Sequence, residues 1–231
     1  HFDPDPELER SLSAGGGYVL LEELAFTETA TRFMFTRQSA PRGLADAVLH
    51  AEEFVGDDHF VVALGDSIIK SSDGSSFLRE MISAHLSSGA DCTIAVEEVD
   101  PSEVFRYGII RPRPGSVPGQ YEVEDLVEKP RPEAAPSTLA IAARYVFSPT
   151  IFEAIRRTAP DRNGELQLTD SIKLLIQLGH RVRAIKLRGD ERRYDIGNFE
   201  SYFKAFIDFA LADEKYGYLV RQYLKRKARE F

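Results

Sequence analysis

The chain has 231 residues, of which 43% are hydrophobic and 29% are charged, as is ordinary for a globular protein built on one large core. Its formal net charge is -8, from 29 basic and 37 acidic residues, which argues against a general nucleic-acid binder. No apolar run is long enough to cross a bilayer, and the single cysteine, Cys92, excludes an intrachain disulfide. We therefore expect a cytoplasmic protein without a nucleic-acid or membrane partner.

Apolar runs typical of strands alternate with helical patterns through the first half of the chain. An irregular opening that contains three consecutive glycines, Gly15 to Gly17, precedes a predicted strand at residues 32–36. A helix is predicted after Gly43, and residues 60–64 form a short apolar run without alternation, as expected of a strand buried on both faces. A helix over residues 77–86 and a strand over residues 92–96 follow.

The second half adds a β-rich stretch and then further helices. Residues 107–147 contain three strand-like segments separated by proline-rich turns, which we interpret as strands inserted into or extending the sheet. Helices are predicted at residues 151–158 and 166–178, with a strand at 182–187 and an amphipathic helix around residues 199–210. This order predicts an α/β fold with a mixed, mostly parallel sheet flanked by helices.

The predicted domain organisation is one domain over residues 1–212 followed by a basic helix over residues 213–231. The cations of this last helix, such as Lys225 and Arg226, have two interpretations. They either bind an anionic partner or simply suit the negative end of the helix dipole, and charge runs are more often solvated faces.

The segment FVVALGDSIIK, residues 60–70, places an acid directly after a predicted strand. Asp66 follows Gly65 there. In open α/β sheets, ligands bind beyond the carboxyl ends of the strands, and a carboxylate at that position can hold a divalent cation that neutralises phosphate oxygens. Aspartate is also a favoured turn and helix-cap residue, so Asp66 alone leaves both interpretations open.

Two further segments place glycines where a ligand would approach the backbone. In QSAPRGLADAV, Gln38 precedes Gly43, which opens a helix, and an amide there suits the recognition of a base edge. In RYGII, Gly108 lies within a strand, where close approach by a ligand is one usual reason for glycine.

Two other segments place charged residues at strand ends. DLVEKP ends a strand with Glu128 and Lys129, an acceptor for hydroxyl groups beside a cation for phosphate. RRYDIGN supplies a second strand-end acid, Asp195, followed by Gly197. Together with Asp66, these residues indicate a site for a phosphorylated ligand.

Seven motifs follow one another along the chain: GLADAV, LGDSI, YGII, VEKP, LAIAARYVFSPTIFEAI, GELQLTDSI and YDIGN. In this order they make the sequence similar to the bacterial UTP–glucose-1-phosphate uridylyltransferases, members of the sugar nucleotidyltransferase superfamily. The resemblance extends from His1 to about Ala210. It implies a Rossmann-like nucleotidyltransferase fold with an inserted β-rich segment, and a homo-oligomer, either a dimer or a tetramer.

For the nucleotide end of the site, the resemblance assigns four residues. Gln38 and the backbone at Gly43 match positions that contact uracil, and Asp66 and Asp195 match the acids that hold Mg²⁺. Each has a structural alternative. Gln38 could cap a loop, Gly43 could only open a helix, and Asp195 could be a turn acid.

For the sugar end, the resemblance assigns Gly108, Glu128 and Lys129 to the sugar phosphate, with Glu128 at the glucose hydroxyls and Lys129 at the phosphate. Lys129 could instead be a solvated surface lysine, since lysine is usually exposed. A further group in GELQLTDSI is expected to serve helix capping and subunit contacts: Glu165, Gln167, Thr169 and Asp170.

One family feature is absent from these 231 residues. Members of the family carry a G-x-G-T-R loop followed by a P-K pair, which cradle the nucleotide phosphates, and the run Gly15 to Gly17 lacks the basic residues. We therefore expect that the chain is a fragment of a longer protein, beginning after its second or third strand. On its own it should be inactive.

The function implied is uridylyl transfer from UTP to glucose 1-phosphate, which gives UDP-glucose and pyrophosphate with Mg²⁺ as cofactor. Asp66, Lys129 and Asp195 would be the catalytic residues. Two alternatives stay open: a nucleotidyltransferase for another sugar or nucleotide, such as dTTP, and a non-catalytic sugar-nucleotide-binding module. A metal-dependent glycosyltransferase is disfavoured, because Asp66 is followed by Ser67 and Ile68 and not by an acid-x-acid pair.

Overall fold

The computed structural model describes residues 5–24, 33–71 and 76–230. The chain divides into two compact units, His1–Arg37 and Gln38–Phe231. The boundary predicted between residues 212 and 213 falls between two helices of the second unit and remains a prediction. Within the described residues, no helix is both long and apolar enough to span a bilayer.

The first unit contains two short helices, α1 (Pro6–Ala14) and α2 (Tyr18–Leu24). Helix α1 begins because the Asp5 side chain accepts hydrogen bonds from the backbone N–H groups of Glu7 and Leu8, both at 3.1 Å, and because proline suits the first helical position. The predicted irregular opening is therefore wrong. The strand predicted at residues 32–36 is also wrong for residues 33–36, which the structure assigns to no strand; Arg32 lies outside the described residues.

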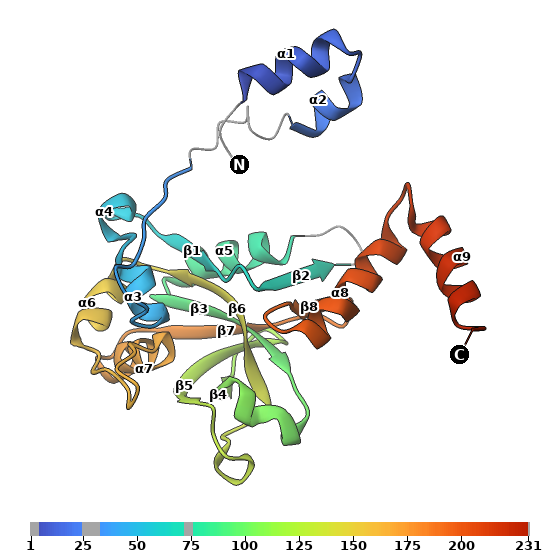
Figure 1. Ribbon diagram of the computed structural model, residues 1–231. Coiled ribbons are helices and arrows are strands. Elements are labelled where there is room, and N and C mark those ends of the chain that lie inside the picture. Colours follow the sequence, from blue (N-terminus) through green and yellow to red (C-terminus); the bar gives the residue numbers. More distant parts are fainter. Residues whose placement is uncertain (1–4, 25–32, 72–75, 231) are drawn as a thin grey trace. The chain divides into compact units, whose positions relative to one another are not determined.

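The second unit holds the sheets and most of the helices (Figure 1). In chain order its elements are α3 (Leu44–Leu49), α4 (Glu52–Val55), β1 (Phe60–Ala63), β2 (Ser67–Ser71), α5 (Phe77–Ser88), β3 (Cys92–Glu98), η2 (Pro101–Arg106), β4 (Gly108–Pro114), β5 (Gln120–Glu128), η3 (Pro132–Ala134), β6 (Leu139–Phe147), α6 (Thr150–Arg157), α7 (Leu168–Gln177), β7 (Val182–Lys186), β8 (Glu191–Asp195), α8 (Phe199–Ala212) and α9 (Gly217–Lys227).

Six strands form one mixed sheet in the order β1-β6-β3-β7-β5-β4, and β2 pairs with β8 in a separate two-stranded sheet. The predicted mixed sheet is confirmed, and the three β-rich segments become β4, β5 and β6 of that same sheet. The expectation that most pairs are parallel is wrong for the described strands, because only β3 and β7 pair in parallel. The physical reason is that β6 inserts antiparallel between β1 and β3 and separates them.

Helices cover both faces of the large sheet, and each face has its own apolar core. On one face, α3, α6 and α7 pack around Ile94, Phe147 and Ile172, each fully buried. On the other face, α5 packs Phe77 and Met81 against the sheet. Strand β3 is buried on both sides because it lies between these cores, which explains its continuous apolar run.

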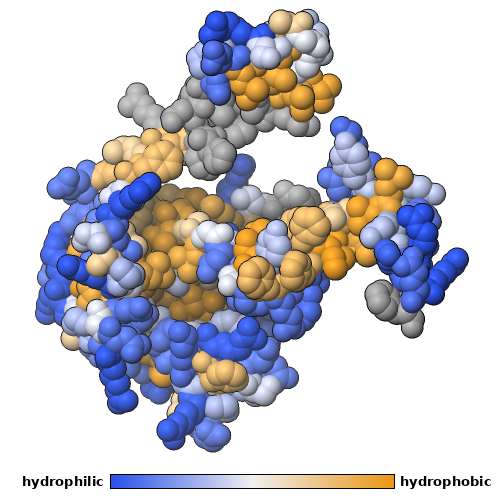
Figure 2. Space-filling model, in the orientation of Figure 1, coloured by the Kyte–Doolittle hydropathy of each residue, from blue (hydrophilic) through white to orange (hydrophobic). Residues whose placement is uncertain are grey.

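Strand β1 was expected to be buried on both faces. In the structure three of its four residues are partly buried and one is exposed. It lies at the edge of the sheet and pairs only with β6 among the described strands. Helix α8 carries the predicted apolar face, but residues of that face such as Phe199 and Phe206 are exposed. Figure 2 shows apolar side chains gathered over α8 and α9.

Candidate functional site

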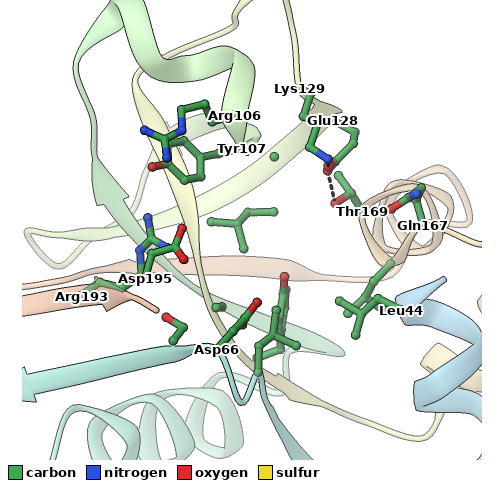
Figure 3. Close-up of a pocket in the computed structure, with 17 residues that line it drawn as sticks. Leu44, Asp66, Arg106, Tyr107, Glu128, Lys129, Gln167, Thr169, Arg193 and Asp195 are labelled. Atoms are coloured by element: carbon green, nitrogen blue, oxygen red, sulfur yellow. Dashed lines mark hydrogen bonds and ion pairs between the residues drawn. The ribbon is translucent and has the colours of Figure 1, made fainter. Parts of the chain in front are cut away.

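A polar cavity of about 320 Å³ opens in the second unit where both sheets and the start of α7 meet. Figure 3 shows its walls, with acids and cations pointing inward from separate elements. Five of the seven residues assigned from the sequence line it: Asp66, Gly108, Glu128, Lys129 and Asp195. These residues are distant in the sequence, so the fold is what assembles them.

The two strand-end acids are brought together by the small sheet. Asp66 stands in the turn between β1 and β2, and Asp195 is the last residue of β8. The register of β2 with β8 pairs Ser67 with Asp195, and the backbone N–H of Ile196 donates to the Asp66 carbonyl at 2.7 Å. Asp66 and Asp195 are therefore neighbours because of this pairing.

Gly197 leaves the space in which these two carboxylates converge. A methyl group added at Gly197 would lie 3.2 Å from Asp195 Oδ1 and 3.3 Å from Asp66 Oδ2. The Gly197 N–H also donates to Asp195 Oδ1 at 2.9 Å, which orients that carboxylate. One oxygen of each carboxylate therefore faces the space at Gly197 that the side chain of any other residue would occupy.

This arrangement fits a magnesium ion. Mg²⁺ is commonly held by one or two carboxylates, with water and substrate phosphates completing its octahedron. Among the described residues, no cluster of three or more histidines, cysteines or acids could hold a metal by itself, so substrate oxygens would have to contribute. Beside Asp66, the hydroxyl of Ser67 lines the cavity, is buried and has no hydrogen-bond partner in the described part of the chain. A buried polar atom of this kind usually has a partner, which a ligand or its water would provide.

The opposite end of the cavity is built around Gly108. Strands β4 and β5 pair Gly108 with Glu128, and the Thr169 hydroxyl at the start of α7 donates to Glu128 Oε2 at 2.7 Å. A methyl group at Gly108 would lie 2.9 Å from Ile141 Cδ1, 3.1 Å from Glu128 Oε2 and 3.3 Å from Thr169 Oγ1. Glycine is required here by close packing, and the Glu128 carboxylate is held in one orientation.

Lys129 follows Glu128 in an unusual backbone conformation. Its φ is 46°, in the left-handed region that residues other than glycine seldom adopt, and its N–H donates to the Tyr107 carbonyl at 3.0 Å. The ammonium lies 3.7 Å from Glu128 Oε1, and the side chain is 64% exposed. Strained residues of this kind cluster at ligand clamps. The lysine is thus held at the rim with its charge available to an anion.

Gln38 and Gly43 lie apart from the lining of this cavity. The Gln38 amide nitrogen donates to Asp46 Oδ2 at 2.6 Å and to the Gly43 carbonyl at 3.1 Å, so both of its hydrogens are used. Gly43 has a φ of 94° and packs against the backbone of Leu166, where a methyl group would lie only 2.5 Å from an oxygen. Leu44, the residue after Gly43, does line the cavity.

Several lining residues were not singled out from the sequence. Arg106, Tyr107 and Arg193 add two cations and a ring to the wall near Asp195. Burial, the largest single influence, would lower the pKa of Arg193, but the charge and hydrogen bond of Glu97, its ion-pair partner, together with the contributions of Tyr107, outweigh burial and raise the pKa. These residues belong to the motifs RYGII and RRYDIGN, but arginine and tyrosine are common on protein surfaces and, unlike glycine or aspartate at a strand end, carry no signal of a site by themselves.

The motif GELQLTDSI contributes residues to the cavity wall in addition to the roles predicted for it. Gln167 occupies the N-cap position of α7 but makes no capping hydrogen bond with its side chain, and Gln167 and Thr169 both line the cavity. Burial, followed by the nearby charge of Glu128, raises the pKa of Asp170 and of Tyr145. The prediction of subunit contacts remains untested, and the capping role of the Gln167 side chain is wrong.

Comparison with known proteins gives one consistent family. The sequence profile described as "Nucleotidyl transferase" matches residues 18–210. A UTP–glucose-1-phosphate uridylyltransferase from Streptococcus pyogenes is 43% identical over 213 residues, which cover 91% of this chain and 68% of that protein. A second uridylyltransferase, from S. pyogenes serotype M3, is 42% identical over 91% of this chain and 70% of its own length.

Solved structures agree with the sequence matches. A UTP-bound UGPase from Acinetobacter baumannii superposes with a TM-score of 0.86 at 34% identity, covering 96% of this chain and 76% of that one. A UDP-glucose pyrophosphorylase complexed with UDP-glucose gives 0.78 at 33% identity, covering 92% of this chain and 75% of its own. The nucleotidyltransferase fold expected from the motifs is confirmed. The chain belongs to the nucleotidyl transferase family, among the UTP–glucose-1-phosphate uridylyltransferases.

Proposed function

We propose that this protein transfers a uridylyl group from UTP to glucose 1-phosphate and that the cavity described above holds the reacting groups. One observation carries the proposal. The cavity joins two carboxylates that converge at Gly197 to a carboxylate–lysine pair at Glu128 and Lys129. A metal-bound triphosphate and a sugar phosphate need these two kinds of site side by side.

The sugar phosphate is assigned to the Gly108 end. Glu128, fixed by Thr169, would accept hydrogen bonds from sugar hydroxyls, and Lys129 would attract the phosphate. A carboxylate whose orientation is already set loses little entropy when a sugar binds. The exposed lysine can follow the phosphate because its charged end is mobile on a flexible stem.

The nucleotide is assigned to the Asp66 end. Asp66 and Asp195 would hold Mg²⁺, which when bound neutralises phosphate oxygens and increases the electrophilicity of the α-phosphorus. Gln38 and Gly43 remain assigned to the base. Because both amide hydrogens of Gln38 are used within its own segment, its carbonyl oxygen would accept from the N3–H of uracil.

In the reaction, a phosphate oxygen of glucose 1-phosphate bonds to the α-phosphorus of UTP while the bond from that phosphorus to the bridging β-oxygen breaks. Pyrophosphate leaves with that bonding pair. The protein forms no covalent bond in this scheme, so its residues act by orienting the two substrates in line and by stabilising charge.

The test is a pyrophosphate-release assay with UTP, glucose 1-phosphate and Mg²⁺. It is run on the full product of the gene and on the 231-residue chain beside it. We expect turnover by the full product, and loss of most of it in Asp66→Asn, which keeps size but removes the charge. We expect none from the chain alone, because the G-x-G-T-R loop is not among its residues. Wild-type turnover by Asp66→Asn would remove Asp66 from the mechanism.

The same assay with dTTP, or with other sugar 1-phosphates, addresses substrate specificity. Higher kcat/KM with one of these would replace the proposed substrates while keeping the reaction class. Binding of UDP-glucose by the full product without any turnover would favour a non-catalytic sugar-nucleotide-binding module.

A further inference from the structure

Arg144 is not among the lining residues of the cavity but contacts the turn that carries Asp66. It belongs to β6, and the pairing of β1 with β6 sets it opposite Ala63, just before that turn. Its guanidinium Nη2 donates to the Ser67 carbonyl at 2.6 Å, and Nη1 donates to the Leu64 carbonyl at 3.2 Å. One side chain therefore binds the residues on both sides of Gly65 and Asp66.

The hydrogen bond that closes the turn itself is weak. The Ser67 N–H donates to the Leu64 carbonyl at 3.3 Å, which is long for a hydrogen bond between backbone groups. Gly65 lies at its centre with no heavy atom within 4 Å of the position of an added Cβ. A glycine-containing turn of this kind costs more entropy to fix than one made of other residues. The planar, two-armed guanidinium supplies the missing rigidity.

Strand β6 is distorted at the point where it presents this arginine. Between the pairs Ile94–Tyr145 and Val96–Ile141 the register of β3 with β6 shifts. Within this bulge Ala143 has a φ of 57°, and its carbonyl accepts from Leu64 N at 3.2 Å and from Arg144 Nη1 at 2.9 Å. Bulges next to active sites redirect side chains, and left-handed alanine is costly unless its surroundings enforce it.

Electrostatics argue against a metal-attracting role for this residue. Burial lowers the pKa of Arg144, and the negative charge of Asp66 partly opposes that shift, which places the two charges within reach of each other. A fixed cation near a metal ligand weakens the attraction of that ligand for another cation. The benefit of Arg144 must therefore be geometric.

We propose that Arg144 is a positioning residue that fixes the turn Leu64–Ser67 so that the Asp66 carboxylate faces Asp195 across Gly197. The opposite side of the turn is held by Ile196, whose N–H donates to the Asp66 carbonyl at 2.7 Å. Asp66 is thus clamped between β6 and the end of β8. This proposal rests on the metal role of Asp66 proposed above.

The test compares Arg144→Met and Arg144→Lys with two other variants of the full gene product. Met removes the charge and all three side-chain hydrogen bonds, of which two reach the turn, whereas Lys keeps the charge but cannot form the two-armed contact. Arg181→Met is the matched control, because Arg181 also donates to a backbone carbonyl, that of Ser88 at 2.7 Å, but its other side-chain hydrogen bonds go to Glu122 and not to the turn Leu64–Ser67. Asp66→Asn tests the metal ligand itself.

The first readout is Mn²⁺ binding, followed by electron paramagnetic resonance of the free ion, with and without UDP-glucose. Loss of the two hydrogen bonds to the turn, each of ordinary net strength, predicts about tenfold weaker Mn²⁺ binding in Arg144→Met. Arg144→Lys should be weakened less, and Arg181→Met should bind as the wild type does. A second readout is faster hydrogen exchange at the amides of Ser67 and Ile196 in both Arg144 variants. In turnover, kcat should fall while the KM for glucose 1-phosphate stays constant.

The outcomes separate the two proposals. Suppose that Asp66→Asn weakens Mn²⁺ binding, whereas every Arg144 variant that folds binds Mn²⁺ normally or more tightly. Only the positioning role of Arg144 is then overturned. If Asp66→Asn itself binds Mn²⁺ normally, the metal role fails and the positioning role falls with it. If Arg144→Met does not fold, Arg144→Lys alone decides, because it retains the charge and the length of the side chain.

Discussion

Replacement of Gly108 by alanine should damage sugar recognition while leaving the fold intact. An added methyl group would lie 2.9 Å from Ile141 Cδ1 and 3.1 Å from Glu128 Oε2. Non-bonded carbons make their best contacts at roughly 3.5–4.0 Å, so the neighbours must move by about 0.6 Å. Backbone strain does not arise, because the φ of Gly108 lies outside the left-handed region.

The size of the effect follows from this displacement. A catalytic group misplaced by about 1 Å can lower the rate on the order of 100-fold, so we expect a 10-fold or greater loss of kcat/KM for glucose 1-phosphate. The KM for UTP should not change, because the disturbed carboxylate is at the sugar end. Alanine in a strand gains up to about 1 kcal/mol over glycine, which offsets part of a packing cost of about 1–3 kcal/mol. The loss of unfolding free energy should stay below about 2 kcal/mol.

The measurement is steady-state kinetics with each substrate varied, together with chemical unfolding of the same preparations. Gly189→Ala is the matched control, since an added methyl group there meets no heavy atom within 4 Å and its φ is also unexceptional. Wild-type use of glucose 1-phosphate by Gly108→Ala, or an equal loss for both substrates, would show that Glu128 does not bind the sugar as we propose.

Four further outcomes are expected. Glu128→Gln should raise the KM for glucose 1-phosphate far more than that for UTP in the same kinetic assay. Gly197→Ala, whose methyl group would enter the space between the two acids, should weaken Mn²⁺ binding in a titration without unfolding the protein. Ser67→Ala should raise the unfolding free energy by about 1 kcal/mol, because it removes a buried hydroxyl without a described partner, and should lower turnover if that hydroxyl meets a ligand. Burial is the main cause, and the charge of His59 the second, that lowers the pKa of His85 to about 4 in the folded protein. As pH falls, this histidine therefore takes up its proton in the unfolded chain before it does so in the folded one. Chemical unfolding should therefore show about 2 kcal/mol less stability at pH 5 than at pH 7, a difference that His85→Asn should lack.

The main sheet could be predicted because its strands are recognisable from local sequence. Strand β3 lies between two apolar cores, so its residues are apolar without alternation, and β4 to β6 are bounded by proline-rich turns. Their pairing was not predictable in the same way. Nothing local indicates that β6 inserts antiparallel between β1 and β3, because that choice depends on contacts formed far along the chain.

The terminal misassignments have local explanations. Asp5 and Pro6 are a standard helix start, but the run of three glycines that follows suggested an irregular segment. Residues 33–36 have strand-like composition, yet the structure assigns them to no strand. Propensity describes what a segment can do, whereas its context in the fold decides what it does.

The candidate site could be predicted residue by residue but not as an arrangement. Glycine and acid signals identified Asp66, Asp195, Gly108 and Glu128, because these residue types have special meaning at strand ends. Arg144 lies within the motif LAIAARYVFSPTIFEAI and has no local signal of its own, since the role proposed for it depends on two backbone carbonyls and a bulge. Residues that act through backbone groups leave no such signal in one sequence.

Strand register explains why both ends of the cavity pair a carboxylate with a glycine. At one end, β4 and β5 set Gly108 opposite Glu128; at the other, β2 and β8 set Ser67 opposite Asp195, two residues before Gly197. A slip of one residue in either pair would turn the carboxylate to the other face of its sheet. The spaces at Gly108 and Gly197 are occupied by carboxylate oxygens only when the paired strands keep the register described above. The site is therefore sensitive to changes in turns and bulges that never touch a substrate, and the bulge at Ala143, which presents Arg144 to the Asp66 turn, is such a place.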